Sequence, residues 1–145
     1  MADSSRDKSR GRQDAAYEKR STFREEDILR VHEKAAVGQH RGTGVRDPRK
    51  LRALAEDVRR SAANRRDPAE IIAGVLDDIE RDPQPFADCN HRTAMQLGRF
   101  IAFEFGLTLK YSGPEGERLR RRWGEMSKKE LKEWVSAHLV ALKGR

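Results

Sequence analysis

Hydrophobic residues recur at helical spacing through most of the chain after residue 22. This periodicity predicts helices over 23–36, 48–63, 68–81, 90–105 and 128–142, together with an arginine-rich helix after Pro114. The segment 90–105 has the highest apolar content, so it is expected to be the central and most buried helix. Only 107–111 has the character of a short extended piece. The pattern therefore predicts an all-α fold, a compact bundle of about six helices with almost no sheet.

Start and stop signals support these helix boundaries. Asp-Pro pairs at 47–48 and 67–68 are strong helix starts, because Asp accepts hydrogen bonds from free backbone N–H groups and Pro needs no donor in the first turn. Capping boxes are predicted at 22–25, 67–70 and 127–130. Pro83 and Pro85 end the third predicted helix, 68–81, because proline does not fit a helix interior.

The first 21 residues differ in composition from the rest of the chain. Residues 1–21 contain almost no large apolar side chain before Tyr17 and are rich in Ser, Arg, Asp and Lys, which predicts a disordered basic arm. Residues 22–145 are expected to form one domain. Inside it, the glycine-rich stretch 38–44 is too rich in glycine for a helix and predicts a loop or small hairpin.

Composition narrows the class of protein. The single cysteine, Cys89, excludes an internal disulfide, no apolar run is long enough to span a membrane, and the first residues contain no apolar signal segment. A cytoplasmic protein without membrane partners is expected.

The net charge is +7, but the basic residues are scattered except for the run Arg118–Arg122, which is typical of a solvated helix face. Nucleic-acid binding is therefore expected to be absent or non-specific.

The stretch 84–94 carries the most chemistry. A loop ending in Asp88 enters a helix whose first residues include Asn90 and Arg92. A helix N-terminus attracts anions through its free N–H groups and its dipole, and Arg92 adds a bidentate donor suited to phosphate. Asp88 is an oxygen ligand well placed for Mg²⁺ between such phosphates. The structural alternative is that Asp88 or Asn90 only caps the helix.

The same stretch resembles the motif of the Fic/Doc family. Phe86, Asp88, Cys89, Asn90 and Arg92 occur in the family's order, and Thr93-Ala94 continues as in Doc proteins. The segment 23–32 is similar to the family's first helix and 44–47 to the segment after it. Because the matches keep their order from about residue 22 onward, the resemblance is more specific than a short motif alone.

The resemblance implies a function. Proteins of this family transfer AMP, or a phosphoryl group in Doc, from a nucleotide to a protein hydroxyl. It implies ATP or another nucleoside triphosphate and Mg²⁺, with Asp88 holding the metal and Asn90, His91 and Arg92 at the phosphates. Phe86 would anchor the loop in the core. A flap that aligns the target protein falls on Gly44, Val45 and Arg46.

Two departures from the family pattern matter. Gln84 stands where the family has its general-base histidine, and glutamine cannot accept the proton of an attacking hydroxyl. The sequence leaves open whether Gln84 is natural or introduced. His91 replaces the Gly or Lys of the family and Met95 its second arginine, a pattern nearer to Doc, the toxin of a toxin–antitoxin pair. The resemblance thus allows a small antitoxin as partner.

Three hypotheses from different functional classes remain open. The first is a Doc-like transferase, inactive or weakened at residue 84. The second is a pseudoenzyme that binds a nucleotide or a protein without turnover. The third, least favoured, is a basic helical module that binds nucleic acid. His91 lies seven residues from Gln84, and the sequence favours a solvent-facing or phosphate-facing His91 over a replacement base.

Overall fold

The computed structural model describes residues 4–37 and 44–142 and confirms an all-α fold. Its helices are α1 (Ser4–Arg20), α2 (Glu25–Ala35), α3 (Pro48–Ala63), α4 (Pro68–Glu80), α5 (Asn90–Glu104), α6 (Gly113–Arg122) and α7 (Lys128–His138). A 3₁₀ turn, η1 (Trp123–Glu125), follows α6. The strands β1 (Leu107–Leu109) and β2 (Leu139–Ala141) pair antiparallel. No helix in the described ranges is long and apolar enough to cross a membrane.

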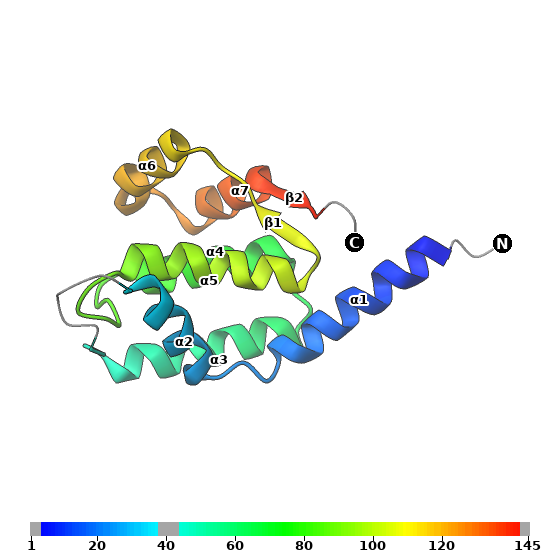
Figure 1. Ribbon diagram of the computed structural model, residues 1–145, viewed down its shortest axis with the longest axis horizontal. Helices are drawn as coiled ribbons and strands as arrows, with labels where there is room; N and C mark the ends of the chain where they lie inside the picture. Colours follow the sequence, from blue (N-terminus) through cyan, green and yellow to red (C-terminus); the bar gives the residue numbers. More distant parts are fainter. Residues whose placement is uncertain (1–3, 38–43, 143–145) are drawn as a thin grey trace.

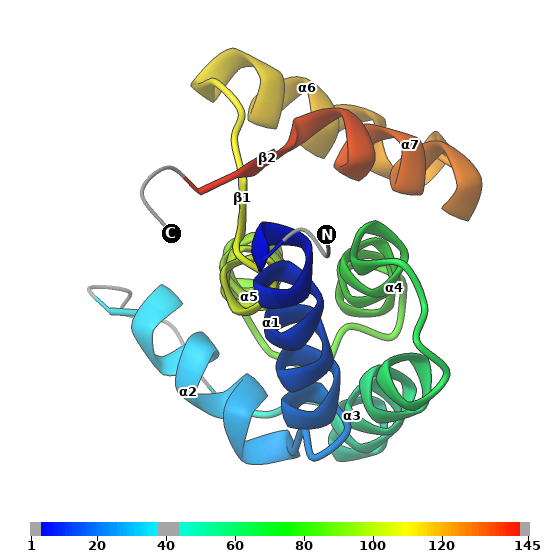
Figure 2. The ribbon, with the colours of Figure 1, turned by 90° about the vertical axis from the view of Figure 1, so that its right-hand side faces the viewer.

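The helices lie in layers around α5. In Figure 1, α4 and α5 run side by side through the middle, with α2 and α3 on one side and α6 and α7 on the other. Figure 2 shows the same layers end-on, with β1 leading from α5 toward β2. Helix α5 contacts α4, α2 and β1. Its buried apolar residues include Ala94, Leu97, Ile101 and Ala102, all without exposed surface, so α5 is the central helix that the apolar pattern predicted.

Most predicted helix starts are confirmed. Asp47 accepts hydrogen bonds from the backbone N–H groups of Arg49 (3.1 Å) and Lys50 (3.3 Å), and Asp67 accepts one from Ala69 (2.8 Å). The capping box between Ser127 and Glu130 is present in both directions. Each of these side chains supplies an acceptor that the backbone N–H groups at the helix start lack.

The predicted capping box at Thr22 is wrong. The Thr22 hydroxyl donates to the carbonyl of Lys19 (2.8 Å), and α2 starts after Arg24, whose backbone N–H donates to Asp27 (2.9 Å). Thr22 is unavailable to α2 because it belongs to the turn that ends α1. At the other end of the chain, α7 stops at His138, before the predicted 142, because Leu139–Ala141 pair with β1 instead.

The predicted disordered arm is also wrong, because Ser4–Arg20 form α1. Its C-terminal half is held by contacts far away in sequence. Ala16 is buried, and the Tyr17 hydroxyl donates to the carbonyl of Arg66 (2.7 Å). The Tyr17 ring meets Phe105 edge-on at 4.8 Å. A polar sequence thus becomes a docked helix through a few side chains that contact α3 and the end of α5.

Arg20 is a buried charged group near the end of α1. Its side chain is 4% exposed, it lies 3.4 Å from the Glu104 carboxylate, and its guanidinium lies 5.4 Å from the Phe23 ring centre and 5.1 Å from that of Phe100. Burial lowers the pKa of Arg20, and the Glu104 charge opposes that shift. Cation–π contact and the ion pair offset part of the lost hydration, while Nε and one terminal nitrogen stay buried without a hydrogen-bond partner.

Replacing Arg20 therefore tests how α1 is held. Lys19 approaches the same Glu104 carboxylate at 3.3 Å but is 63% exposed, which makes it a matched control. We expect Arg20→Ala to lower the free energy of unfolding by about 2 kcal/mol, whereas Lys19→Ala costs about 0.5 kcal/mol or less. Urea titration followed by circular dichroism measures both. Equal effects would show that α1 is held by surface charge alone.

A carboxyl pair lies between α3 and α4. Burial, together with a hydrogen bond and charge repulsion from Asp57, raises the pKa of Asp78 to about 7. In the unfolded chain Asp78 titrates near 4. Between these values the folded state binds the extra proton, so stability falls as the pH rises from about 4 to 7.

This linkage predicts the effect of one substitution. Asp78→Asn should keep the neutral hydrogen bond at every pH, so its melting temperature should exceed that of the wild type at pH 8 and approach it at pH 5. The exposed Glu56→Gln (Glu56 is 57% exposed) serves as the control and should leave the pH dependence unchanged. Thermal denaturation across that pH range measures the difference. A wild-type melting temperature that rises over the same range, unaffected by Asp78→Asn, would contradict the assignment.

Candidate functional site

The loop between α4 and α5 is anchored by Phe86, as predicted. Phe86 has no exposed surface, and its ring stacks on that of His32 at 3.6 Å between centres with the planes 3° apart. His32 on α2 is itself buried, and its Nδ1 lies 2.9 Å from the Thr93 hydroxyl on α5. His32 is therefore a core residue, and the stack joins α2, the loop and α5 at one point.

Asn90 holds the loop backbone. Its Oδ1 accepts a hydrogen bond from the Phe86 N–H (3.0 Å), and its Nδ2 donates to the Phe86 carbonyl (2.9 Å) and to Oε1 of Gln84 (3.3 Å). These bonds use both amide protons of a side chain that is 7% exposed. Asn90 was expected at the phosphates, but here it shapes the loop and offers no amide proton to a ligand.

The start of α5 has no side-chain cap. The residue before the helix, Cys89, adopts the left-handed conformation (φ 62°, ψ 26°) without a capping hydrogen bond. Asp88 does not cap α5 either, because its Oδ1 accepts from the adjacent Cys89 N–H (2.7 Å). The alternative that Asp88 or Asn90 caps the helix is therefore wrong. The first-turn N–H groups of α5 remain available to an anion, and a left-handed non-glycine residue beside them is typical of a functional turn.

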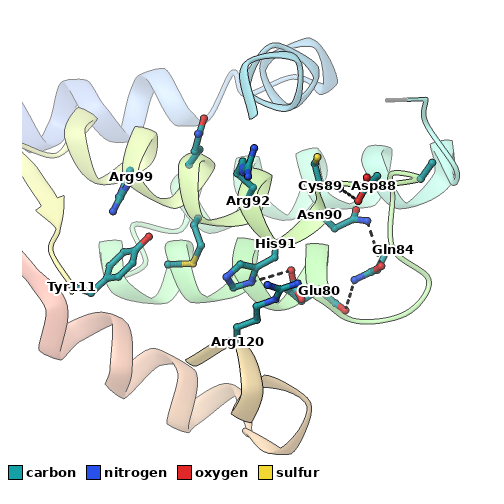
Figure 3. Close-up of a pocket in the computed structure, with 13 residues that line it drawn as sticks. Glu80, Gln84, Asp88, Cys89, Asn90, His91, Arg92, Arg99, Tyr111 and Arg120 are labelled. Carbon is teal, nitrogen blue, oxygen red and sulfur yellow. Dashed lines mark hydrogen bonds and ion pairs between the residues drawn. The ribbon is translucent and has the colours of Figure 1, made fainter. Parts of the chain in front are cut away.

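A cavity of about 580 Å³ opens beside this helix start (Figure 3). Its volume is in the range of small-molecule sites. The wall combines the predicted motif with residues of α4, α6 and the segment after β1. The lining residues are Glu80, Gln84, Ala87, Asp88, Cys89, Asn90, His91, Arg92, Met95, Gln96, Arg99, Tyr111 and Arg120.

Arginines from two helices line the cavity. Arg92 is exposed, and one of its N–H groups donates to the carbonyl of Ala35 (3.1 Å), which leaves other donors of the guanidinium for a ligand. Arg99 lies two turns further along α5, with its guanidinium 4.7 Å from the Tyr111 ring centre. Arg120 reaches in from α6 (Figure 3). Arg120 is exposed, as the predicted solvated face of 118–122 implies, and it also lines the cavity.

Glu80 lies between Gln84 and His91 (Figure 3). Its carbonyl is 3.4 Å from Nε2 of Gln84, and its Oε1 is 3.4 Å from Nδ1 of His91. The His91 side chain is 26% exposed, and its ring meets Trp123 edge-on at 5.4 Å. His91 is therefore a partly buried residue of the cavity wall and does not face open solvent.

The predicted flap pairs with the motif loop. Val45 forms an antiparallel bridge with Phe86, in which the Arg46 N–H donates to the Pro85 carbonyl (2.7 Å) and the Ala87 N–H to the Gly44 carbonyl (3.1 Å). The rest of the glycine-rich stretch, 38–43, lies outside the described residues. Gly44, Val45 and Arg46 are thus next to the cavity, but their backbone groups on this edge are used within the chain.

A metal ion would depend on its ligand here. Over 4–37 and 44–142, no group of His, Cys, Asp or Glu side chains is arranged to hold an ion by itself. Asp88 does line the cavity with a carboxylate. One carboxylate plus substrate phosphates is an ordinary environment for Mg²⁺, so the residues fit an ion that arrives with a nucleotide.

A scan against protein-family models, a search of curated proteins and a search of solved structures each give no match to this chain. The site must therefore be judged by its residues. Sequence reasoning brought Gln84, Asp88, His91 and Arg92 together correctly, as all four line the cavity. It missed Glu80, Arg99, Tyr111 and Arg120. The i,i+3 and i,i+4 spacing of Arg92, Met95 and Arg99 was the available signal for one wall.

The hydrogen-bonding pattern predicts different roles for two amides. Asn90→Ala removes the paired bonds to Phe86 and leaves buried backbone groups without partners, so we expect a loss of about 2–3 kcal/mol of stability. Gln84→Ala removes only the two long bonds of 3.3 and 3.4 Å and should cost about 1 kcal/mol or less. Urea denaturation compares them, and a Gln84→Ala variant as unstable as Asn90→Ala would refute this ranking.

Proposed function

We propose that this cavity binds a nucleoside triphosphate, ATP in the first instance, together with Mg²⁺. The protein would act as a Doc-like transferase toward a protein hydroxyl, weakened at residue 84. The observation that carries the proposal is the uncapped N-terminus of α5, which opens onto a cavity lined by Arg92, Arg99 and Arg120. Free N–H groups, a helix dipole and guanidinium groups are the combination that binds phosphate chains.

The dimensions of the cavity support an extended ligand. Arg92 and Arg99 are seven residues apart on α5, which places them about 10 Å apart along the helix axis. Asp88 lies at one end of this row, where Mg²⁺ would neutralise phosphate charge. Tyr111, stacked against Arg99, provides an aromatic surface at the other end. A nucleotide matches this arrangement, because it carries the phosphate charge at one end and a planar base at the other.

Residue 84 limits the chemistry. The Gln84 amide is used within the loop, with Nε2 toward the Glu80 carbonyl and Oε1 toward Asn90. An amide has no basic nitrogen, so Gln84 cannot take the proton of an acceptor hydroxyl. Transfer that depends on position 84 is therefore expected to stay near background while nucleotide binding persists.

The competing function is a pseudoenzyme that binds a protein, such as an antitoxin, without binding a nucleotide. The half-exposed apolar residues Phe100 (39%) and Phe103 (47%) lie on α5 outside the cavity, which is consistent with a further contact surface. Binding of ATP decides between the two functions, because a pseudoenzyme that binds only a protein needs no phosphate site.

Calorimetry with ATP and Mg²⁺ tests the proposal. We expect binding that weakens without Mg²⁺ and that weakens about 10- to 100-fold in Arg92→Ala, because hydrogen bonds from a charged donor are lost. Arg118→Ala is the matched control, since Arg118 is exposed on α6 and does not line the cavity. In a labelled-nucleotide assay, Gln84→His should raise transfer by about 10²–10⁴-fold, the range of one general base, if no other residue of the cavity supplies the base.

Absence of ATP binding by the folded wild-type protein would remove the nucleotide function and favour the partner-binding alternative. Equal losses in Arg92→Ala and Arg118→Ala would show that binding follows overall charge, without a defined site at α5.

A further inference from the structure

We propose that His91, oriented by Glu80, is the proton acceptor of this site and replaces a base at position 84. The inference rests on the proposed nucleotide function and adds to it the residue that performs the acid–base step. Sequence spacing argued against this role, because seven residues separate His91 from Gln84. The folded arrangement changes that judgement.

The first argument is proximity. Gln84 and His91 both contact one residue, Glu80: the former meets its carbonyl at 3.4 Å and the latter its carboxylate at 3.4 Å. The two positions are therefore separated by no more than one glutamate. Both side chains also line the same cavity.

The second argument is orientation of the ring. Nδ1 of His91 is buried beside Oε1 of Glu80, and both atoms lack hydrogen-bond partners of good geometry at their separation of 3.4 Å. Trp123 contacts the ring edge-on and restricts its rotation. Since Nδ1 is buried and the residue lines the cavity, Nε2 is the nitrogen that a ligand can reach.

A carboxylate on one imidazole nitrogen and substrate on the other is the arrangement of a general base. The carboxylate selects the tautomer with a proton on Nδ1 and stabilises the imidazolium that forms. Such hydrogen bonds are often long and poorly aligned without substrate and tighten when it binds. The distance of 3.4 Å between Nδ1 and the carboxylate is consistent with this state.

The proposed step is simple. The oxygen of an acceptor hydroxyl or water forms a bond to a phosphorus atom of the nucleotide, while the bond from that phosphorus to the leaving group breaks. The leaving group, a nucleoside diphosphate or pyrophosphate, departs with the electron pair. The hydroxyl proton passes to Nε2 of His91, and the positive charge of the ring then faces Glu80.

Other charged groups around the ring come from each neighbouring element. Glu80 belongs to α4, Arg120 to α6, and Asp88 and Arg92 lie at the start of α5, all on the wall of the same cavity. The arginines stabilise developing negative charge on phosphate oxygens, whereas Glu80 is the acid that touches the His91 ring. Glu80 is therefore the residue that positions the His91 ring.

Hydrolysis of Mg²⁺-ATP, with water as acceptor, tests the inference without knowledge of the protein target. Separation of AMP and ADP by chromatography shows which bond is cut. We expect product above the enzyme-free rate, because His91 takes the proton that the attacking water loses. His91→Gln should lower kcat about 10²-fold or more, while the Kd for ATP changes less than tenfold.

Glu80→Gln provides the second readout. It should lower kcat with little change in the Kd for ATP, because the carboxylate no longer orients the His91 ring or stabilises the imidazolium that forms. A merely structural role of Glu80 would weaken ATP binding as much as it lowers kcat. Glu133→Gln is the control: Glu133 is exposed on α7, outside the cavity, and its substitution should leave kcat and Kd unchanged.

The outcomes separate the two proposals. A protein that binds ATP but releases no product at any pH overturns the role of His91 and leaves the nucleotide site standing. A protein that does not bind ATP removes both. The inference is also overturned if His91→Gln turns over at the wild-type rate, or if its affinity for ATP falls as much as its kcat. If His91→Gln does not fold, an unchanged kcat in Glu80→Gln overturns it.

Discussion

The paired hydrogen bonds between the Asn90 side chain and the Phe86 backbone determine the rest of the site. They fix the backbone of a nine-residue loop, 81–89, over the core. Because Asn90 is occupied in this way, it does not cap its own helix. The N-terminus of α5 stays open, and that open end is the element from which an anion site is built.

The same bonds explain why glutamine is accommodated at position 84. Asn90 presents one amide proton to Oε1 of Gln84, and the Glu80 carbonyl faces its Nε2. Glutamine matches this acceptor and donor pair with one side chain. The loop therefore keeps its shape with a side chain that cannot accept a proton at that point. Structure and chemistry at residue 84 are separable, which is why the two variants at this position are informative.

Much of the fold was predictable because its signals are local. Asp-Pro helix starts, the capping box at Ser127 and the apolar stripe of α5 depend on residues within one or two turns. The errors arose where distant contacts decide. Tyr17 is held by a carbonyl 49 residues away and Arg20 by a carboxylate 84 residues away, so a polar segment forms a helix that no local pattern indicates. Glu80 and Arg120 were missed for the same reason, because their neighbours in the site come from other helices.

A base on α5 instead of the loop would also change the side from which an acceptor approaches. The Gly44 carbonyl and the Arg46 N–H are bonded to Ala87 and Pro85, so these two groups are not available to a target strand. His91 faces the other wall, between α4 and α6, where Glu80 and Arg120 lie. An acceptor that delivers its proton to Nε2 of His91 must therefore reach the phosphorus along the α6 side of the cavity. Arg120, which lies on that path, would then contact both the phosphate and the incoming group.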